Sequence, residues 1–279
     1  MIYLIFSILS SVLVAVIIRL NEAKNLNRAA VMLFNYITAA AIGILLTNEL
    51  PSLKTFSILL PLGSFTGFIY VATFFVYMYS VRQMGMAIPV TVTRLSVVVP
   101  VLGSVIIFSE AITSIQSLGI LMALISIFLF SWNDKKLKTT GDRKEFYLPI
   151  LLFLMMGSGD FSLKVFQGIY PADYLMSFII LVFVISSILS LFLVLVKRVK
   201  ISRQIIIAGF LLGIPNYFSA YFILKALQQL SGAITFTLNN IGIIMLSTFL
   251  GFIIWREPLK RKAIFAIVFA IISVILLNI

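Results

Sequence analysis

The sequence predicts an all-α integral membrane protein with ten transmembrane helices, arranged as two inverted five-helix repeats. Three observations carry this prediction: the composition, the length of the apolar stretches and a match between the two halves of the chain. The 279 residues are 62% hydrophobic and 11% charged, whereas soluble domains average about 45–50% apolar and about 25% charged residues. Stretches of about 20 apolar residues, each long enough to cross a bilayer core as a helix, recur along the whole chain. Continuous runs of this kind exclude a β-barrel, whose strands alternate over about 10 residues.

Ten apolar segments form the predicted spans, and short connections join them. The first segment lacks a basic region before it and an A-x-A cleavage site, so we expect a retained helix and not a signal peptide. The longest connection, 133–145, is too short for an extramembrane domain. The predicted spans are 2–20, 28–47, 56–80, 87–109, 114–132, 146–167, 173–196, 204–227, 232–254 and 262–279.

The longest connection also divides the chain into two predicted repeats, 1–132 and 146–279, with 133–145 as a basic connecting loop. A shift of 147 residues superimposes spans three to five on spans eight to ten without gaps. Gly85 then meets Gly232, and Glu110 meets Glu257. Because five is odd, the second half enters the membrane from the opposite side. The resulting pseudo-two-fold axis in the membrane plane is typical of secondary transporters.

The distribution of basic residues predicts the orientation. The net charge is +12, and 17 of the 21 Lys and Arg residues lie in or next to the connections after spans one, three, five, seven and nine. Cytoplasmic loops carry the excess of Lys and Arg, so these loops are predicted to be cytoplasmic and both termini to lie outside. The positive net charge is therefore explained by the basic residues of the predicted cytoplasmic loops. A nucleic-acid partner is not expected, because no soluble basic surface with interleaved aromatic residues is present.

Several chemistries are absent from the sequence. It has no Cys and no His, which excludes disulfides, thiolate chemistry and His-based metal sites or proton relays. There is no nucleophile–base set, and the loops are too short to cover an active site. No G-x-x-x-x-G-K-[ST] run supports direct drive by ATP. We therefore expect neither an enzyme nor a cofactor or metal.

Three ionisable residues inside the spans are the first candidate site residues, because an ionisable side chain at bilayer depth costs about 2.5–3.5 kcal/mol and marks a pathway by default. Asp160 and Lys164 share one face of span 146–167. We expect Lys164 to help keep Asp160 ionised, with an ion pair that only packs helices as the alternative. Arg94 lies in span 87–109 on the other side of the midplane. Arg94 and Asp160 are thus poor direct partners but reasonable opposite ends of one site.

Uncharged polar residues and one further lysine complete the candidate set. Substrate contact and helix–helix bonding are equally open for each polar site. Tyr217, Tyr221 and Lys225 lie one turn apart on one face of span 204–227, and consecutive Asn239 and Asn240 point in different directions, so one can line a cavity while the other bonds a neighbouring helix. The full set is Asn35, Asn216, Tyr217, Tyr221, Lys225, Asn239 and Asn240.

Two patterns favour structural roles. Gly63-x-x-x-Gly67 and Gly209-x-x-x-Gly213 predict close contacts between helices. Glu110 and Glu257 follow spans four and nine, where solvation is cheap, so we expect end caps there, with gate residues as the alternative.

Several stretches resemble one branch of a known superfamily. GMAIPVTVTRLSVVVPVLGSVIIFSE (85–110), GSGDFSLK (157–164), GIPNYFSAYFILKAL (213–227) and LNNIGIIMLSTFLGFIIWREPL (238–259) are similar to an uncharacterised bacterial branch of the drug/metabolite transporter (DMT) superfamily, of the EamA type. That branch often has lysine at the position of Arg94. The resemblance implies a transporter of the bacterial cytoplasmic membrane with a central cavity between the halves. Several members place their termini in the cytoplasm, opposite to the charge bias found here.

The resemblance does not name a substrate, because the superfamily moves amino acids, sugars, nucleotide-sugars, sugar phosphates and cationic drugs. The deep cations outnumber the deep acids, which favours a small anionic or zwitterionic metabolite. We therefore expect a secondary transporter that works by alternating access, with the solute and the lipid bilayer as its partners. Proton coupling, uniport and exchange remain open, as do monomer and homodimer. A flippase for a lipid-linked or phosphorylated carrier and a non-transporting membrane scaffold are the alternatives.

Overall fold

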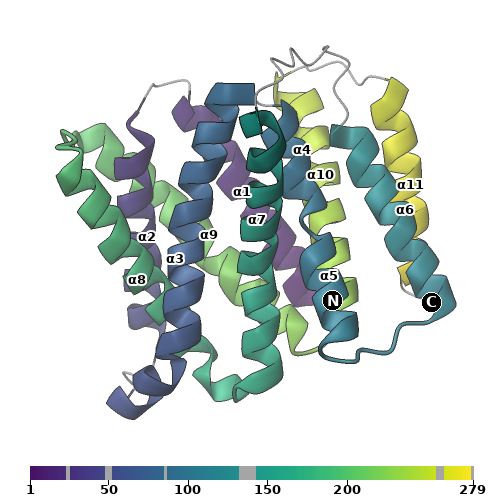
Figure 1. The fold of residues 1–279 in the computed structure, drawn as a ribbon, viewed down its shortest axis with the longest axis horizontal. Coiled ribbons are helices and arrows are strands. Elements are labelled where there is room, and N and C mark those ends of the chain that lie inside the picture. Colours follow the sequence, from purple (N-terminus) through teal and green to yellow (C-terminus); the bar gives the residue numbers. More distant parts are fainter. Residues whose placement is uncertain (23–25, 48–51, 85–86, 132–142, 256–260, 278–279) are drawn as a thin grey trace. The chain divides into compact units, whose positions relative to one another are not determined.

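The computed structural model of the chain is all-helical in the residues that it describes, which are 1–22, 26–47, 52–84, 87–131, 143–255 and 261–277 (Figure 1). No strand occurs among these residues. The helices are α1 (Ile2–Glu22), α2 (Arg28–Leu46), α3 (Leu53–Met84), α4 (Ala87–Leu95), α5 (Val98–Ile106), α6 (Ser114–Ser131), α7 (Arg143–Ile169), α8 (Leu175–Val196), α9 (Arg203–Leu227), α10 (Gly232–Trp255) and α11 (Arg261–Leu277), with a 3₁₀ turn, η1 (Ala172–Tyr174), before α8.

Eight helical segments of the described chain are long and apolar enough to cross a membrane. One of them, Ile88–Ile106, combines α4 and α5. The remaining two predicted spans correspond to shorter apolar helices, Ser114–Leu129 and Ile264–Leu277. The chain thus has the helices of a multi-pass membrane protein, and the ten-span inverted repeat stays a prediction.

The predicted span 87–109 is interrupted between α4 and α5. Pro100 has no backbone N–H, and its ring clashes with the carbonyl four residues earlier in an unbroken helix. That carbonyl, of Ser96, instead accepts a bond from the N–H of Val99 at 3.0 Å. The Ser96 hydroxyl donates to the carbonyl of Thr93 at 2.7 Å, which further ties down the local turn. The break therefore follows from one proline and one serine, and it falls two residues after Arg94.

The described chain forms two compact units. Unit 1 contains 1–71 and 165–228, and unit 2 contains 72–164 and 229–279. Each unit takes residues from both predicted repeats, so the units do not follow the boundary at 133–145. Helices α3 and α7 contribute to both units, because the division falls within them.

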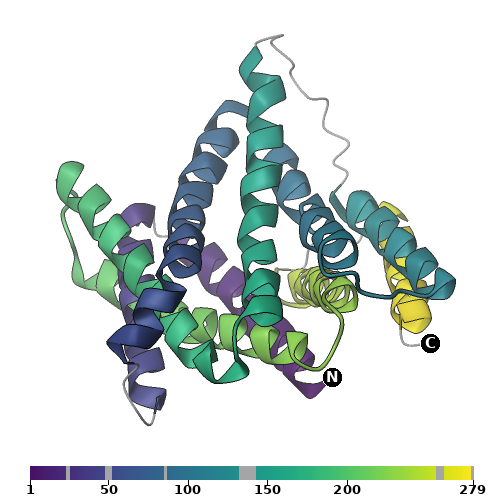
Figure 2. The same cartoon turned by 60° about the horizontal axis from the view of Figure 1, so that its bottom comes forward.

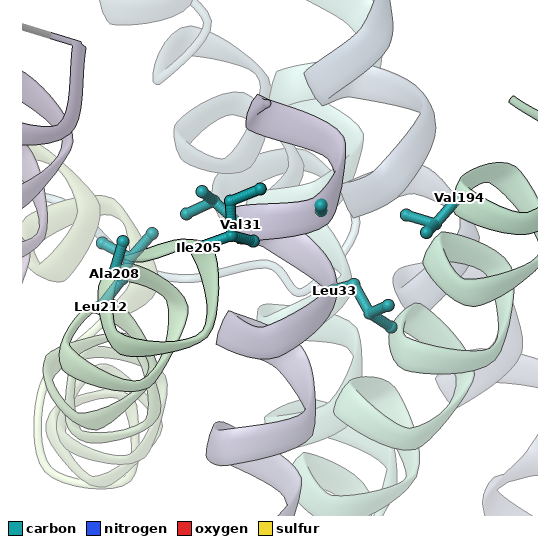
Figure 3. Packing of buried hydrophobic residues seen from close by; sticks show 7 residues of the cluster. Val31, Leu33, Val194, Ile205, Ala208 and Leu212 are labelled. Atoms are coloured by element: carbon teal, nitrogen blue, oxygen red, sulfur yellow. The ribbon is translucent and has the colours of Figure 1, made fainter. Parts of the chain in front are cut away.

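Unit 1 is built around α2, which packs against α8 and α9, while α1 packs against α9. A core cluster of apolar residues joins the three helices (Figure 3), and each of its side chains is buried. The small residues Ala30 and Ala208 in this cluster let the helices approach closely. The cluster consists of Ala30, Val31, Leu33, Val194, Ile205, Ala208 and Leu212.

The two glycine patterns lie at helix contacts in unit 1, as predicted. A Cβ on Gly213 would lie 2.5 Å from the Cβ of Thr38 and 2.6 Å from the carbonyl oxygen of Asn35, both on α2. A Cβ on Gly63 would lie 2.6 Å from a Leu181 methyl carbon of α8. Atoms so close would clash, so the small residues are what permits these helix approaches.

Unit 2 pairs helices in a similar way. Helices α6 and α11 lie side by side, as Figures 1 and 2 both show, and the Ser126 hydroxyl donates to the carbonyl of Ala266 at 2.7 Å. Helix α10 packs against α5 and α6. Gly157 brings α7 against the α4–α5 break, because a Cβ there would lie 2.5 Å from Val99 and 2.9 Å from the Ser96 carbonyl oxygen. Helix α7 remains continuous through this glycine.

Large apolar side chains cover the outer faces of the helices. Phe192 and Leu195 of α8 are 63% and 65% exposed, and Phe265 of α11 is 62% exposed. Such contiguous apolar surface is not stable in water. It is the surface expected where helices face lipid, so the exposure and the helix lengths support the same assignment.

Candidate functional site

Four ionisable residues of unit 2 lie on or next to helices that are apolar elsewhere. Arg94 is in the last turn of α4, Asp160 lies within α7, and Lys164 follows Asp160 by one turn. Glu110 lies in the connection between α5 and α6. Lys164 is 5% exposed, so its side chain is buried within the protein.

Lys164 forms a salt bridge with Glu110, in which Nζ lies 2.6 Å from Oε1. The expected pair of Lys164 with Asp160 is therefore not the contact that the structure shows. The physical reason is that the Glu110 carboxylate is already held in place, because it accepts bonds from the backbone N–H groups of Gly232 at 2.8 Å and Ala233 at 3.1 Å. A fixed carboxylate is a better partner for a flexible lysine stem than a neighbour on the same helix.

Glu110 caps the N-terminus of α10, and not α5 or α6, the helices on either side of it in the sequence. The first N–H groups of a helix have no intrahelical acceptor, and the positive end of the helix dipole favours an anion there. The two carboxylate oxygens take up the first two N–H groups of α10. The prediction of an end cap is thus confirmed for Glu110. Glu257, its predicted counterpart, lies outside the described residues.

The backbone around Glu110 is bent to deliver this carboxylate. Ser109 has a φ of 50°, in the left-handed region that costs a non-glycine residue about 1–2 kcal/mol. The turn brings the Glu110 N–H to the carbonyl of Ser104 at 3.3 Å. On the other side, a Cβ on Gly232 would lie 2.3 Å from the Ser104 Oγ and 3.0 Å from the Lys164 Cδ. Glycine is therefore required at the start of α10 for this approach.

Arg94 and Asp160 interact electrostatically. In the described part of the chain, neither side chain has a hydrogen bond or an ion pair within the roughly 4 Å that defines one. Tyr77 of α3 also interacts electrostatically with Arg94. This arrangement agrees with the prediction that Arg94 and Asp160 are not direct partners. The two side chains thus influence each other electrostatically without forming an ion pair.

Buried polar atoms without a hydrogen-bond partner concentrate in unit 2. Of the seven such side-chain atoms among the described residues, six belong to unit 2 and one to unit 1. Native proteins leave few buried polar groups unpaired, and each needs an explanation such as water, an ion or a ligand. The six residues in unit 2 are Thr73, Ser80, Ser104, Asn239, Ser247 and Ser273.

The two consecutive asparagines of α10 behave differently. Asn239 is 7% exposed, and its Oδ1 is one of the unpaired atoms in the described structure. The Asn240 amide donates to the carbonyl of Phe236 on the same helix at 3.3 Å. The expected bond from one asparagine to a neighbouring helix is therefore replaced by a bond back to the preceding turn, an alternative that asparagine side chains commonly take.

In unit 1 three of the candidate polar residues have hydrogen-bond partners on neighbouring helices. The Asn216 Nδ2 donates to the Asn35 Oδ1 at 3.1 Å, which joins α9 to α2, and Asn35 is 1% exposed. The Tyr217 side chain is fully buried, and its hydroxyl donates to the Met176 Sδ at 3.3 Å. Of the two roles left open for these residues, these contacts support helix–helix bonding.

The predicted face of α9 is present. The rings of Tyr217 and Tyr221 are stacked with centroids 6.2 Å apart, and the Lys225 Nζ lies 5.9 Å from the Tyr221 centroid. The three side chains therefore follow one another along one face, as expected. Lys225 lies in the last turn of α9, where a cation complements the helix dipole.

A groove between α1 and α9 is apolar. Leu13 of α1 and Leu211, Phe218 and Phe222 of α9 line it, and Ser10 is the polar side chain on its wall. None of the candidate residues lines this groove. It therefore lacks a group that would hold a phosphate.

Sequence reasoning missed Ser104 and the role of Gly232. A signal for Gly232 was present, because the 147-residue shift that pairs Glu110 with Glu257 also pairs Gly232 with Gly85. Nothing in the sequence singles out Ser104 among the serines of the apolar spans, since its importance depends on the Ser109 turn.

Comparisons with known proteins support the fold. An uncharacterized protein of Haemophilus influenzae is 27% identical to this chain over 286 residues, which cover 97% of this chain and 95% of that protein. A protein of known crystal structure has a similar fold, with a TM-score of 0.77, 13% identity, and coverage of 99% of this chain and 98% of that chain. At that identity the likeness shows the fold alone. No protein-family model matches the chain.

Proposed function

We propose that the protein is a secondary transporter for a small zwitterionic metabolite, such as an amino acid or a related solute. The observation that carries this proposal is the pair Arg94 and Asp160, which interact electrostatically without a contact ion pair. A charge at this depth is expensive, and a direct pair would reduce the cost. A solute with a carboxylate for Arg94 and an ammonium group for Asp160 satisfies both.

The charge balance of unit 2 favours a zwitterion over a simple anion. Arg94, Asp160 and Lys164 taken alone would carry one net positive charge. The salt bridge of Lys164 with Glu110 neutralises the charge of Lys164, so Arg94 and Asp160 remain as one positive and one negative group. Complementarity then requires one charge of each sign on the solute.

Unpaired polar atoms supply further support. The Asn239 Oδ1 and the hydroxyls of Thr73 and Ser80 are buried in unit 2 and have no partner among the described residues. Buried water or a polar solute satisfies groups of this kind. A purely structural scaffold would gain stability by replacing them with apolar side chains, so their retention favours a role in solute passage.

The predicted architecture agrees with this function. The proposal includes ten spans in two inverted EamA-like repeats of the DMT type, placed in a bacterial cytoplasmic membrane with the basic loops in the cytoplasm. Unit 1 takes 1–71 from the first predicted repeat and 165–228 from the second, and unit 2 takes 72–164 and 229–279. Units assembled from both halves are what two interleaved repeats would produce. Alternating access then uses equivalent gates on the two sides.

The test is uptake into proteoliposomes that contain the purified full-length protein. The panel compares zwitterionic amino acids with their decarboxylated amines and their deaminated acids, with and without a pH gradient. We expect the zwitterions to be taken up at least about tenfold faster than either singly charged analogue, which is a difference of about 1.4 kcal/mol.

Variants of Arg94 and Asp160 test whether these two residues determine the preference for zwitterionic solutes. Arg94→Gln removes the partner of the solute carboxylate, so the preference for a zwitterion over the amine should disappear. Asp160→Asn removes the partner of the ammonium group, so the preference over the deaminated acid should disappear. Unchanged selectivity in both variants would exclude the proposed site, and equal uptake in empty liposomes would exclude transport.

A further inference from the structure

We infer that Lys164 and the first turn of α10 form a binding site for a carboxylate, which the chain's own Glu110 occupies in this conformation. Glu110 is then an exchangeable ligand that locks the start of α10 to α7. The site itself rests on contacts within unit 2. Only its use by a transported solute rests on the proposed function.

The donors of the site converge on one carboxylate. The Lys164 Nζ and the Gly232 N–H both meet the Glu110 Oε1, at 2.6 and 2.8 Å, and the Ala233 N–H meets Oε2 at 3.1 Å. A helix start combines free N–H donors with a positive dipole end, which suits an anion. The buried ammonium of Lys164 adds a full positive charge to that arrangement.

Ser104 provides independent evidence that this is a polar site. Its side chain is fully buried, and its Oγ has no hydrogen-bond partner among the described residues. The same Oγ lies 2.3 Å from where a Gly232 Cβ would be. The hydroxyl therefore points at the start of α10 as a spare donor. A carboxylate ligand that is placed differently from the Glu110 side chain could accept a hydrogen bond from this hydroxyl.

The connection that carries Glu110 is suited to release. Glu110 is 13% exposed and follows Ser109, whose positive φ stores backbone strain when the carboxylate is in place. Departure of Glu110 would relax this turn, break the salt bridge to Lys164 and leave the first two N–H groups of α10 without their acceptor. An incoming carboxylate restores the same contacts. In the proposed transport cycle the solute's carboxylate would become that ligand only after it has left Arg94.

The Lys164 environment limits what the site accepts. The Phe108 ring lies 5.1 Å from the Lys164 Nζ, and Phe161 packs edge-on against Phe108 with centroids 6.1 Å apart. These rings cover the ammonium group on one side and exclude bulky anions. The chemical class is thus a small carboxylate group, and the probe is formate.

Chemical rescue tests the site with the purified full-length protein in detergent. Glu110→Ala removes the internal ligand, so the melting temperature should fall by about 3 °C or more. Sodium formate should restore it in a saturable manner, whereas sodium chloride at the same concentration should have a smaller effect, because chloride lacks the second acceptor atom that meets the Ala233 N–H. Glu110→Ala/Lys164→Met lacks the cation and should not respond to formate. Equal responses to formate and chloride would overturn the inference.

Cysteine labelling provides a second test that keeps the side-chain size at position 110. The natural chain has no cysteine, so Ser104→Cys places a single buried thiol at the site. Its labelling by a small thiol reagent should be slow with Glu110 present and at least about tenfold faster in Ser104→Cys/Glu110→Gln. Equal labelling rates would show that Glu110 does not hold the α10 start closed. Neither test uses uptake, so an inactive protein in liposomes would leave this site standing, and failure of both tests would leave the proposed transport standing.

Discussion

The two units hold their polar residues in opposite ways. In unit 1 the buried amide of Asn35 and the half-buried amide of Asn216 bond each other, and the Tyr217 hydroxyl has a sulfur partner. In unit 2 Arg94 and Asp160 interact without contact, and six buried polar atoms have no partner in the described structure. Satisfied polar groups rigidify a core, whereas unsatisfied groups cost free energy. Unit 1 thus uses its polar residues for packing, whereas unit 2, apart from the Lys164–Glu110 salt bridge, keeps several polar groups available.

The largest loss of stability is expected at the Lys164–Glu110 salt bridge. Lys164→Met leaves the buried Glu110 carboxylate with backbone donors alone, and breaking a buried pair from one side costs about 3–5 kcal/mol. Lys164→Met/Glu110→Gln removes the uncompensated charge and should recover a large part of the loss. Unfolding free energies in mixed micelles measure both variants. Equal losses in the single and double variants would show that the pair does not act as a unit.

A smaller loss is expected at the glycine contact of unit 1. In Gly213→Ala the new Cβ would lie 2.5 Å from Thr38 and 2.6 Å from the Asn35 carbonyl oxygen, and overpacking of this kind costs about 1–3 kcal/mol. Gly168→Ala is the matched control, because Gly168 is an exposed residue of the last turn of α7. The control should gain up to about 1 kcal/mol. A comparable effect of the two substitutions would contradict the close approach of α9 to α2.

The Asn35–Asn216 pair should lose more stability when one amide is removed than when both are removed. Asn35→Leu buries the Asn216 amide without its acceptor and should cost about 1–3 kcal/mol. Asn35→Leu/Asn216→Leu removes both polar groups and should be more stable than the single variant. The same unfolding assay measures this. If the double variant is the less stable of the two, Asn216 stabilises the fold through a contact other than its bond to Asn35.

The smallest change in stability is expected at Asp160. Asp160→Asn removes a half-buried charge that has no contact partner among the described residues, so the free energy of unfolding should fall by less than about 0.5 kcal/mol or rise. A loss of more than about 2 kcal/mol would show that Asp160 has a structural partner, which would place unit 2 in the same category as unit 1.

Particular residues show how far the sequence leads. Long apolar runs predict the helices because a continuous apolar run can satisfy its backbone in lipid as a helix. The glycine spacings correctly indicate close helix contacts, and the structure supplies the partners, α2 for α9 and α8 for α3. The partner of Lys164 was not predictable, because i,i+4 spacing points to Asp160 while the Glu110 carboxylate arrives through the Ser109 turn. The bond between Asn35 and Asn216 joins residues 181 positions apart, a distance at which a single sequence carries no pairing signal.

The most direct measurement of the central claim is the initial rate of zwitterion uptake into proteoliposomes by two variants, each normalised to the amount of folded protein. Asn35→Leu/Asn216→Leu removes the polar pair of unit 1, and Asp160→Asn removes one unpaired charge of unit 2. We expect the first variant to keep its rate within about threefold of the wild-type protein and the second to lose at least about a hundredfold, or about 2.7 kcal/mol. Near-normal uptake by Asp160→Asn, or loss of uptake by the folded unit 1 variant, would contradict it.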